Sequence, residues 1–534
     1  MNKSSPNRKY LWLYLLSFLF LGNLQKEQPP FIKAGKRPNI LFCIADDASL
    51  EFIGAYGSSL VKTPAFDRVA KEGLLFVNAY TPNAKCSPSR ACILTGRNSW
   101  QLEAAGNHAP IYPEKFITFI EALKGNGYKV GFTGKGWAPG NPGEVEGKPR
   151  QLTGPAYSDI KMETPTKEMS PINYAANFEA FLKSQPVDKP FCFWYGGHEP
   201  HRAYEYGSGV AKGKKKLIDI KKVPEYWMDN DTVRNDMLDY AYEVEYFDSH
   251  LQKILDILEK KGELENTIIV ATSDNGMPFP RVKGQVYEFD NHLPLAIMWK
   301  NHINNPGRKI KDYISFIDFA PTFLELAGLR QEESQMQPIQ GKSIMNLLTS
   351  GKENITDAKR DHVLLGKERT DVGRPHDMGY PVRAIVKGGF MYIKNYEPGR
   401  WPTGNPETGY LDCDGSPTKT AILESHRNGN YNNLWQMAFG KREGEELYQV
   451  SKDPYCLKNL ANDRRYSSTK NNLKSQMEQE LKMQHDPRMY GNGNVFDNYP
   501  YGEPKVRNFY ERFKKGEQVK AGWVNESDFE KNIK

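Results

Sequence analysis

Four short apolar segments recur along the N-terminal part of the chain, separated by longer stretches of mixed polarity. They cover residues 39–45, 128–133, 190–195 and 267–272. Each segment is continuously apolar rather than alternating, which predicts β-strands that are buried on both faces, as in parallel sheets. The stretches between them contain helix-like segments at 116–124, 175–183 and 237–261. This alternation of strands and helices predicts a layered α/β fold.

Each predicted strand runs into a cluster of polar residues. These clusters are Asp46-Asp47, Gly134-Lys135, the stretch 198–202 and Asp274-Asn275. Open α/β sheets bind their ligands beyond the carboxyl ends of their strands. We therefore expect the clusters to lie together in one site.

The pattern changes near residue 380, where alternating positions replace the continuous apolar runs. Segments 382–386 and 390–394 alternate and are joined by Lys-Gly-Gly, which is a hairpin signal, and residues 464–485 have the character of a helix. With 534 residues the chain is too long for one ordinary core. We expect a large catalytic domain over 36–378, a smaller α+β domain over 379–486, and a C-terminal tail over 487–534 that wraps the surface.

The first residues have the character of an export signal. Lys3, Arg8 and Lys9 precede an almost unbroken apolar run at 11–21, which is too short for a comfortable membrane span. We therefore predict a signal peptide over 1–24 and a periplasmic or secreted protein with no membrane span after signal removal. A retained anchor is the alternative, because no small-residue cleavage site is obvious.

The cysteines and the overall charge give little information about the function. An exported protein can form disulfides, and Cys413 with Cys456 is the pair that we expect if any forms. Cys43 and Cys192 lie inside apolar runs and are interpreted as core residues. The formal net charge of +7 is compatible with a polyanionic substrate but does not identify one. The sequence contains no nucleic-acid-binding motif, so we expect no nucleic-acid partner.

The most informative motif is Cys86-Ser87-Pro88-Ser89-Arg90. Proline is well tolerated in the first turn of a helix. The motif therefore predicts a helix with its cysteine at the N-terminus, where a developing negative charge is favoured. A thiolate with a lowered pKa could itself be a nucleophile there, but thiolate chemistry does not require the proline or the arginine.

The acidic clusters offer a ligand set for a metal ion. Asp46, Asp47, Asp274 and Asn275 supply only hard oxygen ligands, which suit Ca²⁺ or Mg²⁺ rather than zinc. For any one of them, a loop residue that caps a strand or a helix is the simpler interpretation. Two such clusters on either side of the cysteine motif favour a metal site.

The cysteine motif between these two clusters resembles the active site of type I sulfatases, in the alkaline phosphatase superfamily. HEPHRAYEYG (198–207), SDNGMPFPRVKGQVYE (273–288) and GYPVRAIVKGGFMYIKN (379–395) look like the heparan N-sulfatase (sulfamidase) branch and its bacterial polysaccharide-sulfatase relatives. The resemblance implies a large N-terminal mixed sheet sandwiched by helices. It also implies a smaller C-terminal α+β domain with an antiparallel sheet.

The resemblance implies the chemistry as well. In this family a maturation enzyme oxidises the motif cysteine, here Cys86, to formylglycine (3-oxoalanine), whose hydrate is the nucleophile. The residues implied to bind one Ca²⁺ are Asp46, Asp47, Asp274, Asn275 and the modified Cys86. The residues implied to act in catalysis are Cys86, Arg90, Lys135, His201 and Lys283. His201 is implied to contact the sulfate or the leaving group and is the candidate general acid.

The sequence departs from the family after Lys135. Many sulfatases carry a histidine two residues after this lysine, and here Trp137 occupies that position. The usual contact to the bridging oxygen is therefore missing or comes from elsewhere, and His108 or His292 could replace it. The predicted substrate contacts are His108, His198, Arg202, His292, Arg374 and His376.

These features predict an exo-acting enzyme that removes sulfate, as ester or sulfamate, from oligosaccharides of a sulfated polysaccharide such as ulvan or a similar algal glycan. A heparan N-sulfatase acting on N-sulfated glucosamine is the alternative. A phosphonate or phosphodiester hydrolase of the same superfamily is a further alternative. A catalytically inactive relative is disfavoured by the intact set of Cys86, Arg90, Lys135 and Asp274.

Overall fold

The computed structural model describes residues 1, 36–184, 186, 189–353 and 355–531. The predicted signal peptide at 1–24 lies, apart from Met1, outside the described residues. The chain from Lys36 onward forms one compact unit. Within the described part of the chain, no helix combines the length and the apolar character needed to cross a membrane.

A mixed sheet of seven strands forms the centre of this unit, in the order β10-β2-β9-β8-β1-β7-β4. The strands β4, β7, β1 and β8 run parallel, whereas β9 is antiparallel to both of its neighbours. Their bounds are β1 Asn39–Ala45, β2 Leu74–Phe76, β4 Lys129–Gly134, β7 Phe191–Gly196, β8 Thr267–Ser273, β9 Leu295–Trp299 and β10 Lys309–Ile310. The predicted buried strands are therefore confirmed to within a residue or two.

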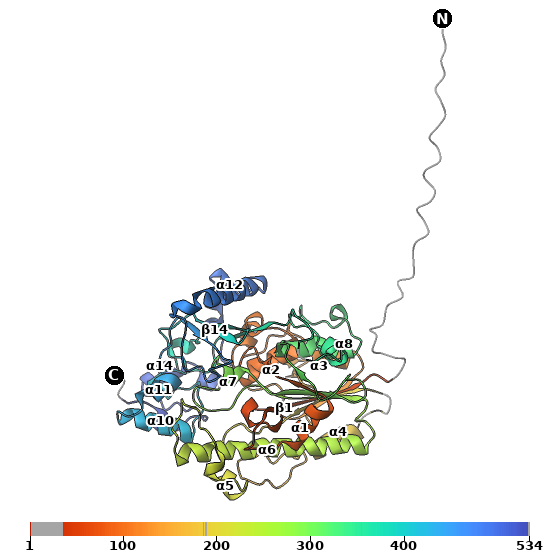
Figure 1. The fold of residues 1–534 in the computed structure, drawn as a ribbon, viewed down its shortest axis with the longest axis horizontal. Helices are drawn as coiled ribbons and strands as arrows, with labels where there is room; N and C mark the ends of the chain where they lie inside the picture. The colour runs from red at the N-terminus through yellow and green to blue at the C-terminus, as the bar shows by residue number, and fades with distance from the viewer. Residues whose placement is uncertain (2–35, 185, 187–188, 354, 532–534) are drawn as a thin grey trace. The chain divides into compact units, whose positions relative to one another are not determined.

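Helices cover both faces of this sheet (Figure 1). One layer contains α1 (Pro64–Glu72), α4 (Tyr174–Lys183) and α6 (Asp231–Lys260), and the other contains α2 (Cys86–Thr95), α3 (Phe119–Gly125) and α8 (Phe319–Leu326). Alternate β1 residues face opposite layers: Leu41 and Cys43 belong to the first apolar cluster, and Ile40 and Phe42 to the second. A strand buried on both faces needs apolar residues at every position, which explains the continuous apolar run.

A second, antiparallel sheet has the order β12-β13-β14-β15, and α12 packs on it. Gly388 and Gly389 both have positive φ in the tight turn between β13 and β14, as the Lys-Gly-Gly signal predicts. The bounds are β12 His362–Lys367, β13 Val382–Lys387, β14 Phe390–Asn395, β15 Glu445–Tyr448 and α12 Ser467–Met483. The sheet thus begins at β12, N-terminal to the predicted boundary at residue 379.

The described chain also contains shorter strands and helices. The short strands are β3 Ala79–Tyr80, β5 Glu144–Val145, β6 Lys148–Pro149 and β11 Ile314–Ser315. The short helices are α5 Ser208–Ala211, α7 Glu288–Asn291, α9 Met345–Thr349, α10 Pro417–Arg427, α11 Asn432–Ala438, α13 Val495–Asn498 and α14 Phe509–Lys514.

The expected disulfide between Cys413 and Cys456 is wrong. Both thiols are free and buried. They belong to different apolar clusters, because Cys413 packs with the first helical layer and Cys456 packs under the antiparallel sheet. Each therefore serves as a small core residue.

Candidate active site

The carboxyl ends of β1 and β8 bring acidic side chains together. These strands are parallel neighbours and pair Ala45 with Ser273, so the residues that follow them lie side by side. The backbone N–H of Asp47 donates to Oδ1 of Asp274 (3.1 Å). Carboxylate oxygens of Asp46, Asp47 and Asp274 lie within 4.8 Å of one another, and all three residues are buried. The predicted acidic clusters therefore lie together at the carboxyl end of the sheet.

Asn275 adds a fourth oxygen beside these carboxylates. Its Nδ2 donates to Oδ1 of Asp47 (2.7 Å) and to the carbonyl of Gly276 (2.9 Å), which fixes the amide. Its Oδ1 is buried without a hydrogen-bond partner. A buried polar atom without a partner is costly, and an orphaned oxygen beside three carboxylates fits a site built for a hard cation.

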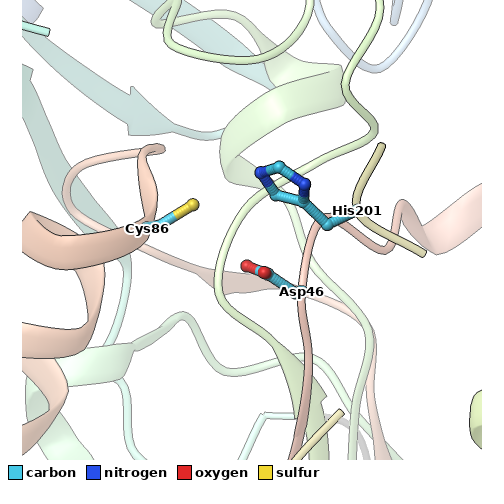
Figure 2. Close-up of side chains that lie close together, drawn as sticks. All are labelled: Asp46, Cys86 and His201. Atoms are coloured by element: carbon cyan, nitrogen blue, oxygen red, sulfur yellow. The ribbon is translucent and has the colours of Figure 1, made fainter. Parts of the chain in front are cut away.

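Cys86 is the first residue of α2 and faces this acidic group. Its Sγ lies 3.9 Å from Oδ1 of Asp47. Figure 2 shows the side chains of Cys86, Asp46 and His201 pointing toward a common space. Burial raises the pKa of the Cys86 thiol well above its usual range. An unmodified thiol here therefore stays protonated and is a poor nucleophile.

Lysines balance the acidic group. Nζ of Lys135, directly after β4, lies 2.6 Å from Oδ2 of Asp46. Nζ of Lys283 lies 2.7 Å from Oδ2 of Asp47 and 2.9 Å from Oδ2 of Asp414. Burial alone would raise the pKa of Asp46, but Lys135 and other nearby cations hold it well below its usual range.

Arg90 lies one turn after Cys86 and is completely buried. Its Nε donates to Oδ2 of Asp274 (2.7 Å), and its Nη1 donates to the carbonyls of Lys135 and Gly136 (2.8 Å each). Arg90 does not line the cavity that opens above Cys86. Its guanidinium therefore links α2 to Asp274 and to the loop after β4.

A cavity of about 510 Å³ opens above Cys86. It contains the predicted site residues Asp46, Cys86, Lys135, His201 and Lys283, together with His108, His198 and Arg202. His201 is partly exposed, with its Nε2 4.0 Å from Oδ2 of Asp47 and its Nδ1 2.5 Å from the carbonyl of Arg202.

The other predicted substrate contacts in the cavity, His108, His198 and Arg202, differ in how far their side chains are already paired with other protein groups. Nδ1 of His108 lies 2.9 Å from Oδ1 of Asp371, and its Nε2 is buried without a partner. Burial lowers the pKa of His198 to about 4, so this ring is neutral near pH 7. Arg202 forms a bidentate pair with Asp236 (2.7 and 2.8 Å) and is largely occupied by it.

Three predicted substrate contacts do not line the cavity. His292 stacks on Tyr80, its Nε2 donates to the carbonyl of Val77 (2.9 Å), and its Nδ1 lies 2.9 Å from Oε1 of Glu288. Arg374 is buried against Asp412 (2.5 Å). The side chain of His376 is 79% exposed, and its Nδ1 lies 3.6 Å from Oε1 of Glu511. His292 and Arg374 are thus held in pairs with carboxylates, whereas His376 is exposed to solvent. The sequence could not distinguish these three residues from loop residues that face the substrate.

Trp137 does not line the cavity either. Its Nε1 donates to the carbonyl of Ser87 (3.1 Å), and its ring packs edge-on against Tyr112. The indole therefore braces the first turn of α2. Of the two histidines proposed to replace the missing one, His108 reaches the cavity and His292 does not.

Several cavity residues were missed by the sequence reasoning. Nζ of Lys85 lies 3.1 Å from Oδ2 of Asp371, and both side chains are buried. Asp414 binds Lys283, and Tyr501 and Trp523 reach the cavity from the C-terminal tail. Only Lys85 carries a sequence signal, because it precedes the cysteine motif; the others come from irregular segments without a pattern.

Comparisons with known proteins agree with this geometry. The sulfatase family description matches residues 38–329. An ulvan-active sulfatase of Formosa agariphila is 26% identical over 523 residues, covering 89% of this chain and 81% of that protein. Human N-sulphoglucosamine sulphohydrolase is 26% identical over 476 residues, covering 84% and 91%. A structure solved with its substrate D-glucosamine-2-N,6-O-disulfate shares the fold, with a TM-score of 0.60, 23% identity and coverage of 84% and 99%.

Proposed function

This chain belongs to the sulfatase family, and from that premise we propose that it removes sulfate from oligosaccharides of a sulfated polysaccharide, with a formylglycine made from Cys86 and one Ca²⁺. The observation that carries the proposal is the position of Cys86. It lies at the N-terminus of α2, 3.9 Å from the acidic group, in a cavity that is also lined by three lysines, Lys85, Lys135 and Lys283. A helix N-terminus and nearby ammonium groups both favour an anion.

The residues present fit a Ca²⁺ ion. Asp46, Asp47, Asp274 and Asn275 would hold it through oxygen atoms, in keeping with the preference of Ca²⁺ for hard ligands. When bound, the ion would supply positive charge beside the nucleophile and the sulfate group. Burial raises the pKa of Asp274 to about 7, and a divalent cation would oppose this effect and favour the carboxylate.

The residue at position 86 also fits a formylglycine. The buried thiol has a raised pKa and so is a poor nucleophile in its unmodified form. A formylglycine here would supply an oxygen nucleophile instead. The maturation enzyme that makes it would act on the chain before folding buries the motif, because all ten residues of α2 are buried in the folded protein.

Lys135 and Lys283 would bind the sulfate group. An ammonium group has three donor hydrogens, so each lysine can keep its aspartate and still donate to a sulfate oxygen. Arg90 donates four hydrogen bonds, to the carboxylates of Asp274 and Asp46 and to the carbonyls of Lys135 and Gly136. These bonds keep the acidic group and the loop after β4 in place. The cavity therefore combines fixed cations with a buried acidic support.

In its protonated form, which Asp371 favours and burial opposes by lowering the pKa, His108 can give the Nε2 proton to the departing oxygen or nitrogen. A histidine Nδ1–H that donates to a carboxylate leaves Nε2 free to exchange a proton. Asp371 accepts from Nδ1 of His108, and Nε2 has no other partner. His201, whose Nε2 lies near Asp47, would hold the sulfate end of the substrate, as the family resemblance implies.

The substrate is proposed from the relatives and from the cavity. A Formosa agariphila relative is named an ulvan-active sulfatase, which supports a sulfated algal glycan and, with the predicted signal peptide, a periplasmic or secreted location. The cavity is lined by loops that follow strands of both sheets and by the tail, which supports removal of sulfate from a chain end. The human relative is named an N-sulphoglucosamine sulphohydrolase, and an N-sulfated glucosamine substrate is therefore the second candidate.

Sulfate release from two oligosaccharide sets would separate these candidates. One set carries N-sulfated glucosamine at the non-reducing end, and the other consists of O-sulfated ulvan fragments. We expect the matured protein to act on the ulvan fragments. Release from the N-sulfated set alone would replace our first candidate by the second. Hydrolysis of a phosphonate monoester or phosphodiester without sulfate release would contradict both.

A further inference from the structure

The C-terminal tail contributes side chains to the same cavity as Cys86. Tyr501, Glu503 and Trp523 line it, although they follow the second sheet by many residues in sequence. The chemistry of sulfate release described above uses none of them. A segment whose aromatic residues face a substrate cavity suggests a role in binding the rest of the substrate.

The first tail contact is fixed against the loop that carries His108. Tyr501 pairs with Pro110 in an isolated antiparallel bridge, and the backbone N–H of Gly502 donates to the carbonyl of Ala109 (2.6 Å). The Tyr501 hydroxyl donates to Oδ1 of Asp371 (3.0 Å), the same oxygen that faces His108. This part of the tail is therefore bound to the active-site wall.

Trp523 is fixed equally well. Its Nε1 donates to the carbonyl of Leu411 (2.7 Å), and its own carbonyl accepts from the N–H of Gly415 (2.8 Å). Gly415 follows Asp414, which binds Lys283. The indole is half-buried, so its polar edge is satisfied by the protein while the side chain still contributes to the cavity surface.

A buried ion pair anchors the end of the tail. Nζ of Lys419, on α10, lies 3.0 Å from Oδ2 of Asp528, and both side chains are fully buried. Phe513 and Phe529 pack against each other in the cluster that also contains Trp523. Because the tail is held on both sides of Trp523, the indole has a fixed position when a ligand arrives.

We propose that Trp523 is a stacking platform for a sugar ring of the substrate, with Glu503 accepting hydrogen bonds from its hydroxyl groups. The inference rests on the proposed function, because it requires a glycan in the cavity. The apolar C–H face of a sugar ring packs well on an indole, whose amphipathic character suits a surface that is part apolar and part wet. The Glu503 carboxylate is exposed and would act only as an acceptor.

The test compares a sulfated oligosaccharide with a small aryl sulfate, which lacks sugar rings. We expect Trp523→Ala to lower the ratio of kcat/KM on the oligosaccharide to kcat/KM on the aryl sulfate by about tenfold, the scale of one aromatic contact. Trp523→Phe should recover part of the ratio. The matched control is Trp401→Ala, because Trp401 is also half-buried and does not line the cavity; its ratio should equal that of the wild type.

A binding measurement makes the result independent of turnover. In the Cys86→Ala background, calorimetry with the same oligosaccharide should show about tenfold weaker binding when Trp523→Ala is added. An unchanged ratio and unchanged affinity would overturn the stacking role while leaving the sulfatase proposal intact. A wild-type protein that releases no sulfate and binds no oligosaccharide would overturn both.

Discussion

Sγ of Cys86 lies 3.9 Å from Oδ1 of Asp47, although 39 residues separate them in sequence. Asp47 follows a central strand, and Cys86 begins a helix on one face of the same sheet. The carboxyl end of the sheet thus supplies the ligands for a metal ion, and the N-terminus of the helix places residue 86 beside them. This relationship makes the metal and the modified residue parts of one site, and the predictions below test it.

Metal removal should inactivate and destabilise the protein. Treatment with a chelator should abolish sulfate release, and Ca²⁺ should restore it. A cation present at 100 times its Kd adds about 2.7 kcal/mol to the stability of the folded state, so Ca²⁺ should raise the Tm measured by calorimetry. Asn275→Ala removes the orphaned oxygen and should shrink this Ca²⁺-dependent rise. Equal Tm values with chelator and with Ca²⁺ in the wild type would exclude the site.

Loss of His108 should affect substrates according to their leaving groups. His108→Gln should lower kcat on a sugar sulfate by roughly 10²–10⁴-fold, the usual contribution of a general acid. The loss should be smaller on an aryl sulfate, whose leaving oxygen needs less protonation. His292→Gln is the control, because His292 lies outside the cavity. An equal loss on both substrates would mean that His108 does not supply the proton.

Placing a histidine at position 137, where many sulfatases carry one, should not improve catalysis. Trp137 braces α2 through its hydrogen bond to Ser87 and its contact with Tyr112. We expect Trp137→His to lower the free energy of unfolding by about 3–5 kcal/mol, as for removal of a large buried aromatic side chain. It should give no gain in kcat on the N-sulfated set. A gain in kcat, measured together with Tm, would show that this position faces the substrate.

Breaking the anchor of the tail should destabilise the protein strongly. Asp528→Asn leaves the buried ammonium of Lys419 without its counter-charge, and the loss should be about 3–5 kcal/mol by urea unfolding. The double variant Lys419→Met with Asp528→Leu replaces both charges by apolar groups and should lose much less. If the single and the double variant lose the same stability, the effect comes from packing rather than from the unpaired charge.

The sequence predicted those parts of the site that follow regular elements. Asp46 and Asp274 end continuously apolar strands, and the proline after Cys86 indicates a helix start, so their meeting follows from general rules of sheet topology. Lys135 and Lys283 came from the family resemblance and from their places after strands. These residues do lie together in the structure.

The rest depends on where irregular loops return. Asp371 and His376 belong to one loop, yet Asp371 is buried beside His108 and His376 points to solvent. No hydrophobic period distinguishes them. The same holds for Trp523, which reaches the cavity only because a distant ion pair and an apolar cluster fix the tail. Cys413 and Cys456 were the pair expected if a disulfide formed, and they are free thiols in two different apolar clusters.

The most direct test is sulfate release by ion chromatography from ulvan fragments and from N-sulfated oligosaccharides, using protein produced with a maturation enzyme. Mass spectrometry of the peptide with position 86 should show the aldehyde in the active wild type. Cys86→Ala should lose roughly 10⁶-fold or more in rate, the scale of enzymatic acceleration, whereas Cys92→Ala, a buried cysteine in the same helix, should remain active. Full sulfate release by Cys86→Ala, or an unmodified thiol in fully active protein, would contradict the account.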